Sequence, residues 1–128
     1  MARILIGDDC PKQRALMDSI LAPDGHDVVA AKDGTDAIRR TQGRGFDLVV
    51  TDILMPGRDG FEVIMASRHC SPAPRIIAIS GVPDLGQPDY LRMARDLGAD
   101  SVLQKPFGAR EFAAAVAQLL PLPLLAAG

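Results

Sequence analysis

Several apolar segments of this sequence end in residues whose side chains bind phosphate or metal ions. Each segment is a short run of aliphatic and β-branched residues, as expected for a β-strand. In an open parallel sheet, the carboxyl ends of the strands meet at one edge, and ligands bind there. The pattern therefore favours a fold that gathers these side chains into one site, and it makes Asp52 a candidate phosphoryl acceptor. The side chains in question belong to Asp8, Asp9, Asp52, Ser80 and Lys105.

The predicted strands alternate with segments of helical periodicity. Most of the strands are continuously apolar, which is typical of strands covered on both faces. Because parallel strands are joined by right-handed crossovers, the helices between them cover both faces of the sheet. We therefore predict an α/β fold with one doubly wound, five-stranded parallel sheet. The predicted strands are Arg3–Gly7, His26–Ala31, Asp47–Thr51, Arg75–Ser80 and Asp100–Gln104. The predicted helices comprise one that begins at Pro11, then Asp33–Gly43, Gly60–Arg68 and Asp89–Leu97, and a last one around Phe112–Leu120.

The composition limits the class of protein. The 128 residues suit one domain, and because 48% are apolar but only 4% aromatic, the core must be aliphatic. The formal charge is −2 with no basic block, so direct nucleic-acid binding is not expected. No apolar stretch approaches the roughly 20 residues that cross a bilayer, and no signal peptide precedes Arg3, so we expect no membrane insertion. The two cysteines make no disulfide framework, and we predict a cytoplasmic location.

The acids at the strand ends predict a metal site. Adjacent parallel strands lie about 4.8 Å apart, so Asp8, Asp9 and Asp52 can converge. Two unit charges about 4 Å apart repel by about 4 kcal/mol at an effective dielectric of about 20. A hard divalent cation relieves this repulsion, and Mg²⁺ is usual where phosphate also binds. For Asp8 and Asp9 alone, helix capping before Pro11 is an equal alternative.

The same edge offers the groups that phosphoryl transfer requires. The reaction needs an in-line nucleophile, a metal that neutralises charge and donors for the equatorial oxygens. Asp52 can serve as the nucleophile and form an aspartyl phosphate. Lys105 and Ser80 can hold the phosphoryl oxygens. Taken singly, Lys105 is better explained as a solvated surface amine and Ser80 as an N-cap or turn residue, and only the conjunction of the strand-end groups favours phosphoryl transfer.

Other reactive or polarisable residues are given structural roles. Free cysteine usually behaves as a small buried hydrophobe, which is the prediction for Cys10. The methionines at helix-stripe positions, Met17, Met65 and Met93, are predicted to be core residues. The two histidines do not have a ligand set at zinc spacing.

Four stretches of the chain resemble the receiver domain of two-component response regulators, in particular the single-domain, chemotaxis-regulator-like members. The likeness spans about residues 3–120, with the motifs in the same order and at suitable separations. They are ILIGDDC (Ile4–Cys10), DLVVTDILMPGRDG (Asp47–Gly60), Ile79-Ser80-Gly81 and Lys105-Pro106-Phe107. The resemblance implies a flavodoxin-like (βα)5 sandwich whose central aspartate accepts a phosphoryl group from a phosphohistidine. The donor in that family is a sensor histidine kinase or a histidine phosphotransfer protein.

The resemblance also implies a role for each matching residue. Asp52 corresponds to the phosphoacceptor, Asp9 to the direct Mg²⁺ ligand and Asp8 to the acid that reaches the metal through water. The backbone carbonyl of Leu54 corresponds to the remaining protein ligand. Ser80 matches the hydroxyl residue that bonds the phosphoryl group and moves on activation. Lys105 matches the family's lysine, whose bond to the following proline is typically cis.

Three positions differ from the usual family pattern. Val102 stands three residues before the lysine, where receivers often carry an aromatic ring that rotates on phosphorylation. The stretch from Ser80 to Gly98 is a few residues longer than in compact chemotaxis-type regulators. The surplus falls in Gly81–Pro88, and we predict a mobile loop there at the ligand-binding edge. Leu54 occupies a position that often influences phosphoryl lifetime, and its bulky side chain is expected to hinder an attacking water.

We predict a receiver domain at residues 1–120 and a tail or linker stub at residues 121–128. The sequence leaves open how this receiver acts and whether another function fits. A receiver would signal by conformational change as a monomer or a phosphorylation-dependent dimer, acting on an effector of unspecified identity. It would be a phosphoacceptor that assists its own phosphorylation and dephosphorylation, not an enzyme. The last residues, 121–128, belong either to a stand-alone regulator or phosphorelay intermediate, or to a linker stub in a longer chain. A small Mg²⁺-dependent aspartyl-phosphate phosphatase and a non-phosphorylated interaction module are the alternative functions. The phosphatase would need an acid where Leu54 stands.

Overall fold

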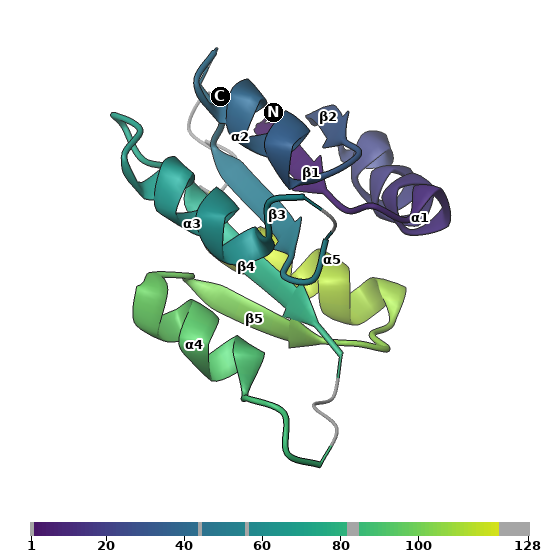
Figure 1. Cartoon of the computed structure of the whole chain (residues 1–128). Coiled ribbons are helices and arrows are strands. Elements are labelled where there is room, and N and C mark those ends of the chain that lie inside the picture. Colours follow the sequence, from purple (N-terminus) through teal and green to yellow (C-terminus); the bar gives the residue numbers. More distant parts are fainter. Residues whose placement is uncertain (1, 44, 56, 82–84, 121–128) are drawn as a thin grey trace.

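Parallel strands lie side by side in the order β2-β1-β3-β4-β5, with helices on both faces of the sheet (Figure 1). The computed structural model describes residues 2–43, 45–55, 57–81 and 85–120. This architecture confirms the predicted doubly wound, flavodoxin-like α/β sandwich. The strands are β1 (Arg3–Gly7), β2 (Asp27–Ala31), β3 (Leu48–Asp52), β4 (Arg75–Ser80) and β5 (Ser101–Gln104). The helices are α1 (Pro11–Leu21), α2 (Gly34–Thr41), α3 (Gly60–Arg68), α4 (Tyr90–Leu97) and α5 (Ala109–Leu119), with a short 3₁₀ turn at Ala22–Asp24.

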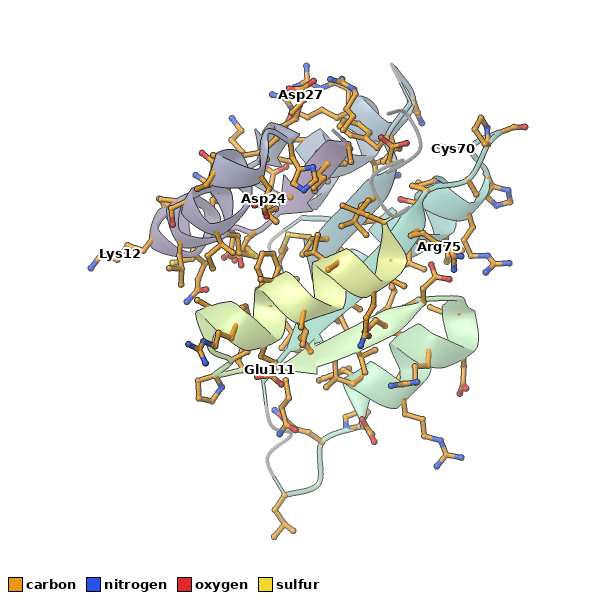
Figure 2. All side chains as sticks on the ribbon, turned by 180° about the vertical axis from the view of Figure 1, so that it is seen from behind. Lys12, Asp24, Asp27, Cys70, Arg75 and Glu111 are labelled. Atoms are coloured by element: carbon orange, nitrogen blue, oxygen red, sulfur yellow. The ribbon has the colours of Figure 1, made fainter. Side chains whose placement is uncertain are left out.

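Successive strand residues face opposite layers, because side chains alternate across a strand. In β3, Leu48 and Val50 pack in the layer of α1 and α5, whereas Val49 faces α2 and α3. Figure 2, viewed from behind, shows α5 lying across the sheet on the first of these faces. The face of α2 and α3 continues toward α4, where Ile76 and Ala78 of β4 are buried. Burial on both faces explains why the strand segments are continuously apolar.

The order of the strands places a switch point between β1 and β3. The chain passes from β1 to β2 on one side and then returns across β1 to β3 on the other. Connections that leave β1 and β3 therefore depart to opposite faces and open a crevice at the carboxyl ends of the two strands. The register pairs Gly7 with Thr51, so the next residues in the chain, Asp8 and Asp52, lie at the same level.

The element boundaries differ from the prediction by one or two residues at several ends. The prediction placed Asp52 after its strand, but β3 includes this residue. Asp52 pairs with Ile79 of β4, and the next amide, that of Ile53, donates to the carbonyl of Ile79 at 2.9 Å. The predicted loop Gly81–Pro88 falls partly outside the described residues, which resume at Leu85, and its mobility stays a prediction.

The predicted core is confirmed for the strands and is wrong for two methionines. Met17 is fully buried beneath α1, as predicted. Met65 on α3 and Met93 on α4 are 49% and 42% exposed, because the buried stripes of these helices are narrower than the sequence pattern indicated.

Among the residues that the structure describes, Phe112 has the largest side chain that is fully buried. It stacks near Phe107 with ring centroids 5.7 Å apart. We expect Phe112→Ala to lower the free energy of unfolding by about 3–5 kcal/mol, because it removes buried area and leaves a cavity. Urea denaturation followed by circular dichroism measures this loss. Gln118→Ala, an exposed change on the same helix, is the control and should stay within about 0.5 kcal/mol of the parent. A loss of less than 1 kcal/mol for Phe112→Ala would contradict the packing described.

Candidate metal and phosphoryl-acceptor site

Three carboxylates converge at the crevice between β1 and β3. Asp8 and Asp9 follow β1 directly, and Asp52 is the last residue of β3. One oxygen from each of the three groups lies within 4.8 Å of the others. The convergence follows from the parallel register, which sets the ends of the two neighbouring strands at one level. The sequence prediction that these acids gather at one edge is thus met by the geometry.

Asp8 is the most buried of these acids, with 1% of its surface exposed. Its Oδ1 accepts a hydrogen bond from the amide of Cys10 at 2.9 Å. Its Oδ2 is buried and has no hydrogen-bond partner among the residues that the structure describes. A buried carboxylate oxygen without a partner is costly, and such an oxygen marks a place where an ion or an ordered water fits.

Burial and charge shift the proton affinity of this site. Burial raises the pKa of Asp8; the amide of Cys10 opposes this, and the negative charge of Asp52 adds to it. Burial acts to lower the pKa of Lys105, but the hydrogen bond to Asp52 and the charges of the acids outweigh it, and the pKa of Lys105 is raised. Lys105 therefore stays protonated and supplies a fixed positive charge to the acidic cluster.

Lys105 is joined to the site by its side chain and by its backbone. Its Nζ lies 2.9 Å from Oδ2 of Asp52, in an ion pair in which the carboxylate is 8% exposed and the lysine 32%. Its amide donates to the carbonyl of Ser80 at 2.8 Å, which ties the end of β5 to the end of β4. The peptide bond from Lys105 to Pro106 is cis. The lysine thus points across β4 to reach the aspartate on β3.

Ser80 lies at the end of the strand next to β3, and Leu54 lies in the chain just after Asp52. Ser80 ends β4, the neighbour of β3, and is 2% exposed. Leu54 lies two residues beyond Asp52 and is 56% exposed, unusually high for a large aliphatic side chain. The structure therefore gathers every predicted site residue at the carboxyl edge of the central strands.

The residues present fit a hard divalent cation. Carboxylate and carbonyl oxygens are the ligands that Mg²⁺ selects, and the acids contribute three negative charges in a small volume. The partnerless Oδ2 of Asp8 adds an oxygen that the protein itself does not satisfy. Asp9 and Asp52, with the backbone carbonyl of Leu54, are the residues that would hold the ion. Asp8 would accept hydrogen bonds from water bound to it.

Two features of the site were not predicted from the sequence. The guanidinium of Arg14 donates to the backbone carbonyl of Asp8 at 2.6 Å and so braces the start of α1 against the acids. In the sequence, the only signal for this contact was the presence of a basic residue, Arg14, in the first turn of the predicted helix. Cys10 was predicted to be buried but is exposed, because it is the N-cap residue of α1, where the chain turns away from the sheet.

A model of the response regulator receiver domain matches residues 4–117 of the chain. The chain belongs to the receiver domain family of response regulators. Receiver domains are phosphoacceptor modules of two-component signalling, they work with histidine kinases or phosphotransfer proteins, and they generally use Mg²⁺ held by acidic residues. Among the residues described, no helix of this receiver is long and apolar enough to span a membrane.

Known proteins similar to this receiver include regulators of different lengths. The transcriptional regulatory protein TcrA of Mycobacterium tuberculosis is 37% identical over 94% of this chain and 48% of its own length. The gliding motility regulatory protein of Myxococcus xanthus is 35% identical over 80% of this chain and 13% of its own. The receiver thus spans about half or less of these two relatives. The chemotaxis response regulator CheY4 of Vibrio cholerae is similar over 94% of this chain and 99% of its own, with 28% identity and a TM-score of 0.82.

The raised pKa of Asp8 predicts a pH-dependent gain in stability when its charge is removed. A carboxyl whose pKa is higher in the folded than in the unfolded protein favours folding below its ordinary pKa and opposes it as the pH rises through the folded value. Without metal, Asp8→Asn should therefore be more stable than the parent at pH 7, and the gain should shrink as the pH falls toward 3.8. The same change should weaken Mg²⁺ binding by about 10–100-fold.

Urea denaturation across this pH range, combined with calorimetric titration of Mg²⁺, measures both effects. Asp18→Asn, which removes an exposed charge from α1, is the control and should change neither strongly. If the metal-free Asp8→Asn protein is less stable than the parent at pH 7, the charge of Asp8 does not destabilise the folded protein, and the prediction is wrong.

Proposed function

We propose that Asp52 accepts a phosphoryl group from a phosphohistidine in a Mg²⁺-dependent reaction. The observation that supports this best is the ion pair of Lys105 and Asp52 beside the acidic cluster. It places a nucleophilic carboxylate, a fixed cation and a set of metal ligands at one strand edge. Transfer of a phosphoryl group requires little more than such positioning and charge stabilisation.

The transfer forms one bond and breaks another. A carboxylate oxygen of Asp52 attacks the phosphorus, and the bond between phosphorus and the imidazole nitrogen of the donor breaks. The electron pair of that bond remains on the nitrogen, and the product is an aspartyl phosphate. Lys105, already 2.9 Å from the carboxylate, offers its ammonium protons to the incoming phosphoryl oxygens.

Bound Mg²⁺ would neutralise charge on the acids and on the phosphoryl oxygens. Asp9, Asp52 and the carbonyl of Leu54 are its proposed protein ligands, with Asp8 acting through water. Ser80, at the end of β4, would donate its hydroxyl to a phosphoryl oxygen. Since the backbone of Ser80 also accepts from the amide of Lys105, movement of either residue is transmitted to the other.

We further propose that the donor is a sensor histidine kinase or a histidine phosphotransfer protein, and that the reaction takes place in the cytoplasm. The receiver would occupy residues 1–120, which agrees with an α5 that ends at Leu119. Residues 121–128 lie outside the part of the chain that the structure describes. This receiver matches about half of the length of TcrA. Two arrangements therefore remain to be tested: a stand-alone regulator, and a receiver that is part of a longer chain.

Phosphorylation at Asp52 is tested directly by intact mass spectrometry. Incubation with Mg²⁺ and a small phosphodonor such as acetyl phosphate should give one base-labile phosphoryl adduct. Asp52→Asn should give none, because an amide is not a nucleophile for this transfer. Asp47→Asn, an acid at the opposite end of β3, is the matched control and should be phosphorylated as the parent is.

The same experiment separates the alternatives. An adduct that persists in Asp52→Asn, or no adduct in the parent, would overturn the assignment. Steady-state hydrolysis of added phosphoesters would instead support an aspartyl-phosphate phosphatase. We expect none, because Leu54 stands where such an enzyme needs a general acid.

The side chain of Leu54 is expected to prolong the life of the aspartyl phosphate. It is large, apolar and 56% exposed, so it can cover the acceptor against water. Leu54→Asn should speed autodephosphorylation several-fold, since an amide can hold a water by hydrogen bonding. The decay of the adduct after removal of the phosphodonor gives the rate. Met65→Asn, at an exposed apolar position on α3, is the control. Fast autodephosphorylation in the parent protein, at a rate that Leu54→Asn does not change, would refute this role of Leu54.

A further inference from the structure

Gly34, the first residue of α2, lies against the connection between β3 and α3. A Cβ atom built on Gly34 would be 1.7 Å from the carbonyl oxygen of Arg58 and 2.5 Å from its carbonyl carbon. Real Cβ atoms do not approach other atoms below 3.0 Å. The obstacle is backbone, so it cannot be relieved by a change of rotamer. Any side chain at position 34 therefore forces either α2 or this connection to move.

The start of α2 is held firmly in place. The side chain of Asp33 accepts from the amide of Asp36 and caps the helix. The carboxylate of Asp36, 8% exposed, accepts from the amide of Lys32 and from the side chains of Arg39 and Arg40. Four hydrogen bonds thus fix the first turn of α2 to the chain before it and to its own second turn.

The connection between β3 and α3 is fixed at both ends but contacts α2 in its middle. The amide of Ile53 donates to Ile79, and that of Gly60 donates back to Ile53 at 2.8 Å. A Cβ on Gly60 would meet the carbonyl oxygen of Asp52 at 2.3 Å, so the two ends of the connection also touch closely. The part that faces α2 lies between these anchors, at Arg58 and at Gly57, whose added Cβ would lie 3.6 Å from Oγ1 of Thr35.

This connection carries the backbone carbonyl of Leu54, the proposed metal ligand. Because the four hydrogen bonds at the start of α2 resist a shift of that helix, a side chain at position 34 would displace the connection instead. Mg²⁺ demands near-ideal octahedral geometry at 2.0–2.1 Å, so small displacements of a ligand cost affinity. Ca²⁺ tolerates longer and more variable distances.

We propose that Gly34 is a positioning residue for the divalent-cation site: its missing side chain lets Arg58 approach α2 and holds the Leu54 carbonyl where Mg²⁺ needs it. Gly34 lies on α2, outside the residues that the site itself supplies. The inference rests on the proposed function, since it takes the Asp9, Asp52 and Leu54 site as the place where the ion binds.

Titration calorimetry of the metal-free chain with MgCl₂ and with CaCl₂ tests this role. Gly34→Ala should bind Mg²⁺ about 10–100-fold more weakly than the parent, as is typical when support of a metal ligand is lost. Its affinity for Ca²⁺ should fall less, so the preference for Mg²⁺ over Ca²⁺ should decrease. A general loss of stability would not change this ratio in protein that is still folded. Gly45→Ala is the matched control, because its added Cβ meets nothing within 4 Å.

A folded Gly34→Ala protein with the Mg²⁺ affinity and ion preference of the parent would overturn the proposal. Should Gly34→Ala fail to fold, Arg58→Gly and the double variant are compared instead. Glycine at position 58 opens backbone conformations that let the carbonyl turn away from α2. The double variant should then bind Mg²⁺ more weakly than Arg58→Gly alone, and equal affinities would refute the role.

Failure of this inference is distinguishable from failure of the proposed site. Asp9→Asn should abolish most Mg²⁺ binding if the ion lies between the acids. Parent protein that binds no Mg²⁺, or binds it unchanged in Asp9→Asn, would remove the proposed site and the role of Gly34 with it. Loss of binding in Asp9→Asn together with unchanged binding in Gly34→Ala would remove the role of Gly34 alone.

Discussion

The mutual repulsion of Asp8, Asp9 and Asp52 is the constraint that organises this molecule. Oxygens of these groups lie within 4.8 Å of one another, and burial of Asp8 weakens the screening that water would provide. A free chain would separate such charges. Here the parallel pairing of β1 with β3 prevents separation, because the register fixes Gly7 opposite Thr51 and both strands are buried. The aliphatic core therefore stabilises an arrangement that is unfavourable by itself, and on the proposed function a bound cation would relieve the repulsion.

Lys105 supplies part of that relief within the protein. Its ammonium group neutralises one charge of the cluster through Asp52, and its raised pKa keeps it charged. One lysine does not balance the acids, so the site still favours a divalent ion. This imbalance suits a phosphoacceptor. A site that the protein neutralised completely would bind neither metal nor phosphoryl group, whereas one with no internal cation would lack a donor for the phosphoryl oxygens.

Much of the fold and site follows from local sequence, and the remainder depends on tertiary contacts. The aliphatic runs predict strands, and because parallel strands end at one edge, the residues after them predict where Asp52 and Lys105 meet. The exposure of Met65 and Met93 could not be predicted from the sequence. An apolar stripe shows which face of a helix is buried, but not how much of that face the neighbouring elements cover. The contact of Gly34 with Arg58 was equally hidden. A glycine at the start of a helix is commonplace in sequence, and only the packing of α2 against a connection distant in sequence explains why this position is glycine.

On the proposed function, the phosphorylated state would be transmitted without an aromatic ring at position 102, where this chain has Val102. Val102 pairs with Ala78 and is partly buried against a hydrophobic cluster that includes Ile53, from the connection after Asp52, and Ala94 of α4. Of the helices described, α4 buries a single residue fully, Ala94, whereas each of the others buries two or more. A helix with little buried surface shifts at low cost.

Charge added at Asp52 acts on Ser80 and Lys105, which lie at the ends of the two strands flanking α4 in sequence. On the proposed function, α4 is accordingly the element whose position phosphorylation changes most readily, and its exposed Met93 and Leu97 are the side chains that such a shift presents differently to a partner.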